Sequence, residues 1–238
     1  MNWESRTELL LGKEKVEILH KSHVLIAGLG GVGAVAAEML VRAGIGSLTI
    51  ADNDIIQASN RNRQIIALAS TEGLQKTEVL AVRLRDINPE LNLIVSNTYL
   101  IREAIPEILE TPYDYVIDAI DTMSPKLYLI INCLEKKYQL VSSMGAGGKF
   151  KPEEVQVADI SKSYQCRLAH YIRKHLHKKG IYTGFKVIYS PEPVSKNAVQ
   201  LTDGDKNKKS IPGTLSYMPA LFGIYAASVV IRDLTGLI

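Results

Sequence analysis

A glycine-rich turn directly after an apolar run is the feature that most constrains how this chain folds. The run "HVLIAGLG" ends in the pattern Gly28-x-Gly30-x-x-Gly33, and an amphipathic stretch at about 32–43 follows it. Glycines at this spacing let the backbone turn tightly from a strand into a helix and approach a phosphate at the positive end of that helix. A turn that only packs a helix against a strand is the structural alternative, but the context favours nucleotide binding.

Asp52 adds a second nucleotide signal. It ends the next apolar run, "SLTIADND", at about the twenty-residue spacing that is typical after such a glycine turn. A carboxylate at this place accepts hydrogen bonds from ribose hydroxyls. Because both dinucleotides and ATP suit this arrangement, these residues alone leave the nucleotide open.

The alternation of short apolar runs with amphipathic stretches predicts the fold class. This pattern builds a parallel sheet with helices on both faces. We therefore expect an α/β fold with a Rossmann-like, doubly wound, mostly parallel sheet, a short N-terminal helix and a buried C-terminal helix. Strands are expected within 23–30, 47–54, 92–99, 113–122 and 139–148, with further strands at 155–160 and 185–190.

The length of 238 residues, of which 46% are hydrophobic, suits one domain with one sizeable core. We expect a nucleotide-binding core at about 22–150. The remainder, 151–238, is expected to complete the sheet and to carry a basic helix, a crossover loop at about 191–212 and the C-terminal helix. The crossover loop is polar and lacks periodicity, so we expect it to be exposed and mobile.

The ends of the chain give the expected location. The N-terminal residues carry charge throughout and resemble no secretory signal, so a cytoplasmic protein is expected. The longest apolar run, 217–231, is shorter than the roughly 20 residues that a bilayer requires. We expect a buried helix there and no membrane partner.

The stretch "NRNRQIIALASTEGLQK", spaced as if along helical turns, places unusual positive charge after the glycine turn. A triphosphate that releases pyrophosphate builds up more negative charge than a dinucleotide does, and fixed cations stabilise that charge. Arg63 and Lys76 are placed for this task, and Asn60 and Gln64 offer neutral hydrogen bonds to phosphate oxygens. The alternative is that these cations form a solvated surface. The amount of positive charge in this stretch therefore favours ATP over a dinucleotide.

Asp121 ends the fourth apolar run, "YDYVIDAIDT". Strand ends on one edge of a doubly wound sheet converge, so this carboxylate is expected near the phosphates held by the glycine turn. Magnesium is commonly bound by one or two carboxylates together with substrate phosphates. The sequence therefore predicts a magnesium ligand at Asp121.

Five stretches in order, "GLGGVG", "ADNDIIQASNRNRQ", "GLQKTEVL", "INP" and "VIDAIDT", resemble the ThiF/MoeB/HesA superfamily of ATP-dependent adenylating enzymes, which is related to ubiquitin-activating enzymes. The resemblance covers residues 1 to about 150. It implies an enzyme that uses ATP and Mg²⁺ to activate a substrate carboxylate. Attack of that carboxylate on the α-phosphate gives an acyl-adenylate and pyrophosphate.

The resemblance also implies roles for individual residues. An arginine near the N-terminus of these enzymes reaches across a homodimer into the partner's site, and "SRTELLLG" places Arg6 at the matching spacing. Asp121 would hold magnesium. The implied catalytic set is Arg6, Arg63, Lys76 and Asp121. The resemblance implies that Asp52 binds the ATP ribose and that Asn60, Arg63 and Lys76 contact the phosphates. With the glycine turn and Gln64 added, the expected nucleotide-binding residues are Gly28, Gly30, Gly31, Gly33, Asp52, Asn60, Arg63, Gln64 and Lys76.

Cysteine usage bears on the substrate. Superfamily members that activate the C-terminal glycine of sulfur-carrier proteins usually carry two C-x-x-C zinc pairs, whereas this chain has only Cys133 and Cys166. No zinc is expected, and the loop at 191–212 offers no cysteine for a thioester. Cys133 lies in an apolar helical stretch and reads as a core residue. Cys166 stands beside Arg167, so a reactive role there stays open.

The second half of the chain resembles one branch of the superfamily, the tRNA threonylcarbamoyladenosine dehydratases. The matching stretches include "SSMGAGGKFKPEEVQVADISKS", "KVIYSPEP" and "GTLSYMPALFGIYAASVVIRDL". The resemblance implies adenylation of the threonylcarbamoyladenosine carboxylate in tRNA, followed by cyclising dehydration without an enzyme nucleophile. Where this branch has Asp-Pro before "LA", this chain has Cys166 and Arg167.

A tRNA substrate predicts a basic surface, and the mild net charge of +3 is compatible with one. The stretch "RLAHYIRKHLHKKG" offers Arg173, Lys174, Lys178 and Lys179 as phosphate contacts. A second basic tract lies at 203–210. The alternative for both is a solvated surface without a partner.

Three other functions remain open. One is adenylation of the C-terminal glycine of a ubiquitin-like sulfur-carrier protein, which would bring a sulfur-transfer protein as a partner. The others belong to different classes: an NAD-binding oxidoreductase that uses the same glycine turn, and a non-catalytic nucleotide-binding protein.

Overall fold

The chain folds around a seven-stranded sheet in the order β3-β2-β1-β4-β5-β7-β6, with β8 and β9 in a separate pair. The computed structural model describes residues 2–201 and 210–237. All neighbouring strands in the large sheet are parallel except β6 and β7. The strands are β1 (His23–Ala27), β2 (Ser47–Ala51), β3 (Asn92–Ser96), β4 (Tyr115–Asp118), β5 (Gln139–Ser143), β6 (Gln156–Asp159), β7 (Lys186–Tyr189), β8 (Val199–Leu201) and β9 (Ser210–Pro212).

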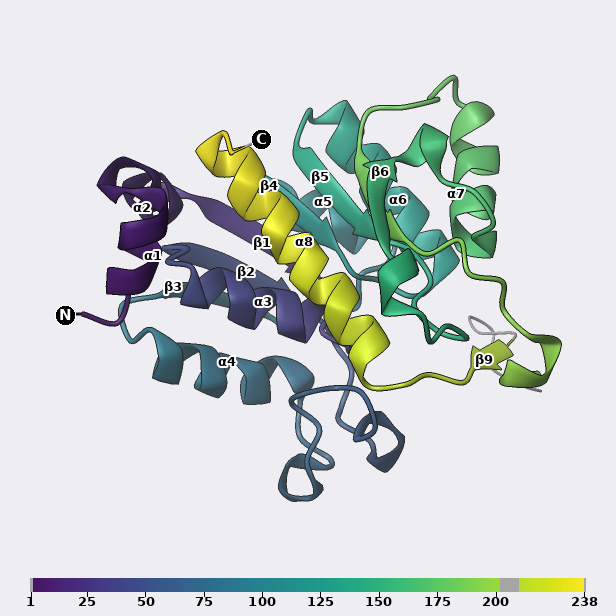
Figure 1. Ribbon diagram of the computed structural model, residues 1–238, viewed down its shortest axis with the longest axis horizontal. Coiled ribbons are helices and arrows are strands. Elements are labelled where there is room, and N and C mark those ends of the chain that lie inside the picture. The colour runs from purple at the N-terminus through teal and green to yellow at the C-terminus, as the bar shows by residue number, and fades with distance from the viewer. Residues whose placement is uncertain (1, 202–209, 238) are drawn as a thin grey trace.

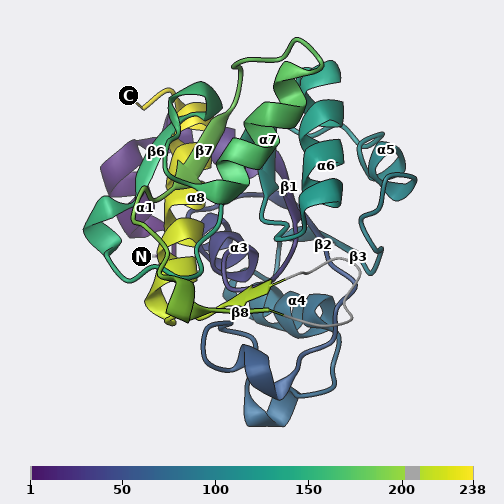
Figure 2. The same ribbon diagram turned by 90° about the vertical axis from the view of Figure 1, so that its right-hand side faces the viewer.

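Helices cover both faces of the sheet (Figures 1 and 2). One hydrophobic cluster joins the sheet to α2, α3, α4 and α8, and a second joins it to α5, α6 and α7. The predicted doubly wound α/β fold is therefore confirmed. The helices are α1 (Ser5–Leu11), α2 (Lys13–Lys21), α3 (Gly33–Arg42), α4 (Lys76–Ile87), α5 (Ala104–Ile108), α6 (Met123–Glu135), α7 (Arg167–His177) and α8 (Tyr217–Thr235).

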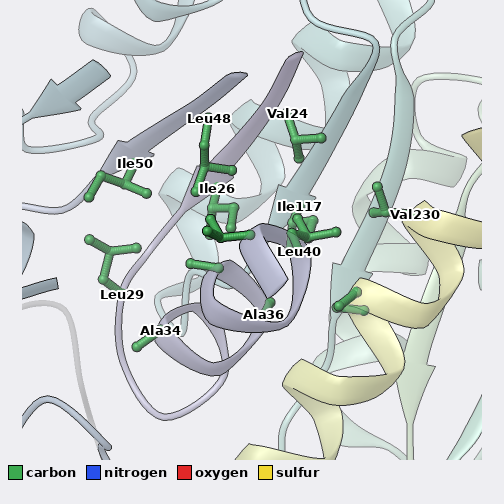
Figure 3. Close-up of a cluster of buried hydrophobic side chains, with 14 of the residues drawn as sticks. Val24, Ile26, Leu29, Ala34, Ala36, Leu40, Leu48, Ile50, Ile117 and Val230 are labelled. Atoms are coloured by element: carbon green, nitrogen blue, oxygen red, sulfur yellow. The ribbon is translucent and has the colours of Figure 1, made fainter. Parts of the chain in front are cut away.

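The central strands are apolar along their whole length because both of their faces are covered. Val24, Ile26, Leu48 and Ile117 are fully buried. Figure 3 shows these side chains from three adjacent strands, together with Leu40 of α3, converging in one cluster. Continuous burial of this kind fixes the register of β1 against β2 and β4, and so fixes where each strand ends.

Helix α8 packs closely against α3, and Gly223 is the reason. A Cβ at this position would lie 2.4 Å from the Val32 carbonyl oxygen and 2.9 Å from the Val35 Cβ. By length and composition alone α8 is apolar enough to cross a membrane, but half of its apolar window is buried. Its packing is that of a core helix.

The strand order places a crevice at the centre of the sheet. The chain moves outward from β1 through β2 to β3, then returns to the other side of β1 with β4 and β5. In open α/β sheets, ligands bind at this reversal, beyond the carboxyl ends of the two strands on either side of it. The turns after β1 and β4 therefore form the expected site.

Residues 60–76 form no continuous helix; only short 3-10 turns, at Ala58–Asn60 and Ala69–Thr71, precede the start of α4 at Lys76. A 3-10 turn ends at Asn60, whose Oδ1 accepts the backbone N–H of Gln57 at 3.0 Å. Gly73 adopts a positive φ of 84°. Side-chain capping by Asn and a left-handed glycine both compete with a continuous helix. The segment is a loop that leads into α4.

Most described residues of the crossover segment after Glu192 are exposed or half-buried, as we expected, but its first two residues are buried. Glu192 near its start is only 2% exposed, and β9 at its end pairs antiparallel with β8 within it. A Cβ on Gly147 would lie 2.5 Å from Pro212, and one on Gly148 would lie 2.4 Å from Val194. The glycine run at 145–148 thus lets the crossover segment pack onto the end of β5. The lysines of the second basic tract, at 206, 208 and 209, lie outside the described residues.

Candidate active site

The glycine turn after β1 leaves no room for a side chain at Gly28 or Gly33. Gly28 has a φ of +91°, and a Cβ there would lie 2.8 Å from the Ala119 carbonyl oxygen. A Cβ on Gly33 would lie 1.8 Å from the Gly28 carbonyl oxygen. Backbone without side chains at the start of α3 is the cradle that a phosphate group requires, because N–H groups and the helix dipole can approach it directly.

Asp52 is fixed against this turn by two hydrogen bonds. Its Oδ2 accepts the Leu29 N–H at 2.6 Å, and its Oδ1 accepts the Asp54 N–H at 2.8 Å. Burial raises the pKa of the Asp52 carboxyl, against the opposing effects of the nearby Lys76 ammonium and these two N–H groups. The predicted ribose ligand therefore lies directly beside the glycine turn, in a fixed orientation.

Lys76 and Arg63 hold the positive charge of the site. Lys76 begins α4, is 5% exposed, and donates from Nζ to Asp54 Oδ2 at 2.6 Å. Arg63 donates from Nη1 to the Ser59 carbonyl at 2.9 Å and to Asn62 Oδ1 at 2.8 Å. A guanidinium has five N–H donors, so these two bonds through one nitrogen leave capacity for phosphate oxygens.

Gln64 carries a buried polar atom without a hydrogen-bond partner in the described part of the chain, Oε1. Its side-chain nitrogen would lie 3.7 Å from a Cβ on Gly30, so the amide faces the glycine turn. Buried polar atoms are rarely left unsatisfied. Since the O and N of an amide can exchange places by a flip, this end of Gln64 can serve a ligand as acceptor or donor. Nucleotide at the glycine turn fits this observation.

Gly31 joins the turn to α8. A Cβ there would lie 2.8 Å from Pro219 and 2.9 Å from the Arg63 carbonyl oxygen. An open pocket of about 310 Å³ lies beside this contact. It is lined by Arg61, Asn62, Arg63, Gln64, Ile65, Ser216, Tyr217 and Ala220.

Asp121 is an exposed carboxylate in the turn after β4. Ala119, two residues before it, donates its N–H to the Ala27 carbonyl at 2.8 Å, so this turn lies beside the glycine turn. Among the described residues, no group of three or more His, Cys, Asp or Glu side chains could hold a metal ion. A single carboxylate still fits Mg²⁺ that is bound mainly through nucleotide phosphates.

Sequence reasoning missed a buried polar cluster below this turn. The Nζ of Lys126 on α6 donates to Asp118 Oδ2 at 2.7 Å, and Ser142 Oγ on β5 donates to the same oxygen at 2.6 Å. Both charged side chains are fully buried. The available signal was the repeated acid in "VIDAIDT", where Asp118 precedes Asp121 within an otherwise apolar strand.

Arg6 does not reach this site within one chain. It is exposed on α1, a helix without buried residues that packs on α2. Glu4 Oε1 lies 2.9 Å from Nε2 of His20 on α2, which holds the start of α1 against α2. Helix α2 leads into the start of β1, whereas the glycine turn follows the end of β1. Helix α1, which carries Arg6, therefore lies at the end of the sheet where β1 begins, away from the glycine turn (Figure 1).

The basic residues of α7 and of the turn that follows it fall into two kinds. Arg173 is half-buried and hydrogen-bonded to Ser163, so it holds the helix to the preceding turn. Lys174, Lys178 and Lys179 are exposed. The three lysines are available to a partner, while Arg173 also has a structural contact.

Both cysteines are buried. Cys133 is fully buried on α6, where burial and then the charge of Asp118 raise the pKa of its thiol. Cys166 is 5% exposed and precedes the first residue of α7. Neither thiol is presented to solvent as a ready nucleophile.

Known proteins resemble this chain along nearly its whole length. The tRNA threonylcarbamoyladenosine dehydratase of Bacillus subtilis (strain 168) is 38% identical over 237 residues, which span 97% of this chain and 93% of that protein. The crystal structure of the E. coli tRNA N6-threonylcarbamoyladenosine dehydratase in complex with ATP has a TM-score of 0.88 and 34% identity, covering 98% of this chain and 93% of that one.

A relative with a different activity matches a shorter part. The molybdopterin-synthase adenylyltransferase of Haemophilus influenzae (strain ATCC 51907 / DSM 11121 / KW20 / Rd) is 35% identical over 161 residues, 65% of each chain. The ThiF family matches residues 5–237. Because this match and the observed fold extend over almost the entire sequence, the chain belongs to the ThiF family.

Proposed function

We propose that this protein is an ATP-dependent enzyme that adenylates the carboxylate of threonylcarbamoyladenosine in tRNA and closes it to cyclic threonylcarbamoyladenosine with loss of water. The observation that carries the proposal is the similarity to tRNA threonylcarbamoyladenosine dehydratases over nearly the full chain. The glycine cradle and the orphaned amide of Gln64 support ATP as the nucleotide.

The residues of the site have distinct tasks in this reaction. Asp52 accepts hydrogen bonds from the ribose, and the glycine turn binds the phosphates through backbone N–H groups. A carboxylate oxygen of the substrate attacks the α-phosphorus, and the bond to the leaving pyrophosphate breaks. Arg63 and Lys76 stabilise the negative charge that grows on the leaving group, with Asn60 and Gln64 as neutral partners.

Ring closure then requires no nucleophile from the enzyme. A nitrogen of the same nucleoside attacks the activated carbonyl carbon, AMP leaves with the oxygen of the former carboxylate, and the nitrogen loses its proton. The nucleoside has then lost one water in total. A reaction without an enzyme nucleophile agrees with the burial of both cysteines.

Asp121 is the residue that we propose to hold Mg²⁺. The ion would neutralise phosphate charge when bound. The exposed position of Asp121 beside the glycine turn supports this placement, since an incoming metal–nucleotide complex can reach it.

The tRNA is proposed to lie on α7. Lys174 on the helix and Lys178 and Lys179 just after its last residue are exposed, and contacts of this kind hold phosphates without reading sequence. Arg173 is included in the same surface, with its bond to Ser163 fixing its position. A tRNA substrate also implies a cytoplasmic location.

A homodimer is proposed because Arg6, the arginine expected at the phosphates, is on α1 in the described part of the chain and not at the glycine turn. Arg6 lies far from the glycine turn of its own chain, and α1 exposes Leu9 and Leu10 at 83% and 84%. Large exposed apolar side chains on an otherwise unburied helix mark an interaction surface. We propose that this surface meets a second copy and brings Arg6 to the partner's phosphates.

The alternative substrate is the C-terminal glycine of a ubiquitin-like sulfur-carrier protein, which would also bring a sulfur-transfer protein as a partner. The similarity to molybdopterin-synthase adenylyltransferase gives it some support, but that similarity covers a smaller part of the chain.

Nucleoside mass spectrometry tests the choice. Threonylcarbamoyl-modified tRNA incubated with the protein and Mg·ATP is expected to yield a modified adenosine lighter by one water, with one AMP formed per product. An unmodified tRNA is the matched control and should yield neither. AMP release with a glycine-tailed carrier protein, but no dehydrated nucleoside, would keep the adenylating site and reject the tRNA substrate.

A further inference from the structure

Three polar side chains meet in full burial beneath the turn that carries Asp121. Asp118 ends β4, Lys126 lies on α6 and Ser142 lies on β5, and all three are 0% exposed. Lys126 Nζ lies 2.7 Å from Asp118 Oδ2 and 3.2 Å from Ser142 Oγ. The cluster therefore ties β4 to the next strand and to the helix that follows the turn.

Asp118 also accepts a hydrogen bond from the backbone of the turn. Its second oxygen, Oδ1, accepts the Ile120 N–H at 3.1 Å. On the other side, Ala119 donates its N–H to the Ala27 carbonyl, and its own carbonyl oxygen leaves no room for a Cβ on Gly28. The turn is thus held from below by Asp118 and from the side by the glycine turn.

The stability of the core does not by itself explain why Asp118, Lys126 and Ser142 are buried there. Replacing a buried ion pair with apolar residues of similar volume is often neutral or stabilising, so charges retained in a core call for another reason. The position of Asp118 suggests the reason why these charges are retained. Asp118 is three residues before the proposed magnesium ligand and one strand away from the glycine turn.

We propose that Asp118, Lys126 and Ser142 are positioning residues that hold the turn at 119–121 at a fixed distance from the glycine turn, so that Asp121 meets the metal–nucleotide complex without rearrangement. The inference rests on the proposed function for the role of Asp121. The cluster itself touches neither nucleotide nor metal and acts only through the backbone of the turn.

Replacing the whole cluster tests this role. In the variant Asp118→Leu, Lys126→Met, Ser142→Ala, no buried charge is left unpaired, so the fold is expected to persist. Glu38→Leu is the matched control, because Glu38 is also buried and paired, with Arg42 and Arg83, but lies on α3 away from the turn. Both variants are compared with the parent by hydrogen–deuterium exchange without ligands and by Mg²⁺ titration of AMP formation.

We expect the backbone amides at 119–122 to exchange about tenfold or more faster in the triple variant, with the rest of the chain little changed. The Mg²⁺ concentration for half-maximal AMP formation should rise about tenfold, while the rate at saturating Mg²⁺ falls by less. Glu38→Leu should change neither. Unchanged exchange at 119–122 in the folded triple variant would overturn the positioning role.

The exchange experiment separates this inference from the proposed function, because it needs no substrate. Faster exchange in the variant, with a parent protein that never dehydrates modified tRNA, would reject the function and retain the positioning role. If the triple variant does not fold, Ser142→Ala provides the test, since it removes one hydroxyl from the cluster. The amides at 119–122 should then exchange severalfold faster. An unchanged exchange rate at these amides would reject the positioning role.

Discussion

The edge of the sheet around the glycine turn and the exposed face of α7 are both proposed to meet substrate, yet they are built in opposite ways. At the sheet edge, Asp52 and Lys76 are tied to their neighbours by hydrogen bonds and are largely removed from water. On α7 and the turn that follows it, Lys174, Lys178 and Lys179 are exposed.

This difference predicts how each region fails. Chemistry at the sheet edge depends on groups held at fixed positions, so one substitution there should cost a large factor in rate. Binding at α7 depends on the amount of positive charge, so losses there should be graded and sensitive to salt. Substitutions at the sheet edge are therefore expected to cost more activity than substitutions on α7.

Arg63→Ala should have the largest effect. Removing a cation that stabilises transition-state charge is expected to lower the rate of AMP formation by about a hundredfold or more, with ATP binding less affected. Arg6→Ala should lower the rate of AMP formation by a similar factor. Rates are measured by AMP release with modified tRNA under single-turnover conditions.

Mixing these two inactive variants tests the shared site. A heterodimer contains one active site with both arginines intact, so activity should partly return when the subunits are mixed and allowed to exchange. Mixing two preparations of Arg63→Ala is the control. Failure of the mixture to recover activity, with exchange of subunits demonstrated, would show that Arg6 does not act across a dimer.

The triple variant Lys174→Ala, Lys178→Ala, Lys179→Ala should have an intermediate effect. Each lost phosphate contact reduces the slope of log affinity against log salt by about 0.7 to 0.9, so a reduction of about two units is expected for the three. The tRNA affinity should fall about tenfold or more at low salt, while ATP affinity is unchanged.

A charge-matched control separates place from net charge. Lys13, Lys15 and Lys21 on α2 carry the same number of charges away from α7. Replacing them with alanine should leave the salt dependence nearly unchanged. Equal losses from both triple variants would mean that overall charge, rather than the α7 surface, governs tRNA binding.

Asp159→Ala should have the smallest effect and concerns the support of α7. Burial raises the pKa of Asp159, but hydrogen bonds from Ser161, Gly184 and Thr183 outweigh this and hold it at about 2, below its ordinary value of 3.8. A lowered carboxyl pKa contributes stability above the ordinary value that is lost as pH falls through the lowered one.

We therefore expect Asp159→Ala to lower the Tm by a few degrees at pH 7, in line with the loss of a capping side chain. The difference from the parent should shrink as pH falls from about 4 to about 2. Glu153→Ala, an exposed acid nearby, is the control and should show little change. A Tm difference that persists undiminished at pH 2 would contradict the assignment.

Much of the fold was accessible from the sequence because it depends on local pattern. Continuous apolar runs mark strands covered on both faces, and the expected strands all appear in the sheet. The glycine spacing marked the turn after β1. Asp52 was placed correctly beside that turn, since parallel strands paired in register must end together.

Other features could not be read from local pattern. Residues 60–76 look helical by spacing, yet side-chain caps and a left-handed glycine turn them into a loop. Glu192 appears in a polar stretch that reads as exposed, but its carboxylate accepts the backbone N–H groups of Phe150 and Lys151, at the far end of the glycine run. Such contacts join residues about forty positions apart.

Three features could be predicted from the sequence alone, because each is carried by residues close together in the chain: the alternation of strands and helices, the glycine turn after β1 and the family to which the chain belongs. Which acid of "VIDAIDT" is buried and which is exposed depended on tertiary packing. The pairing of Asp118 with Lys126 depends on how α6 packs against β4 and β5, and the distance of Arg6 from the glycine turn depends on which edge of the sheet α1 occupies. Burial and distance are properties of packed elements, so no short stretch of sequence contains them.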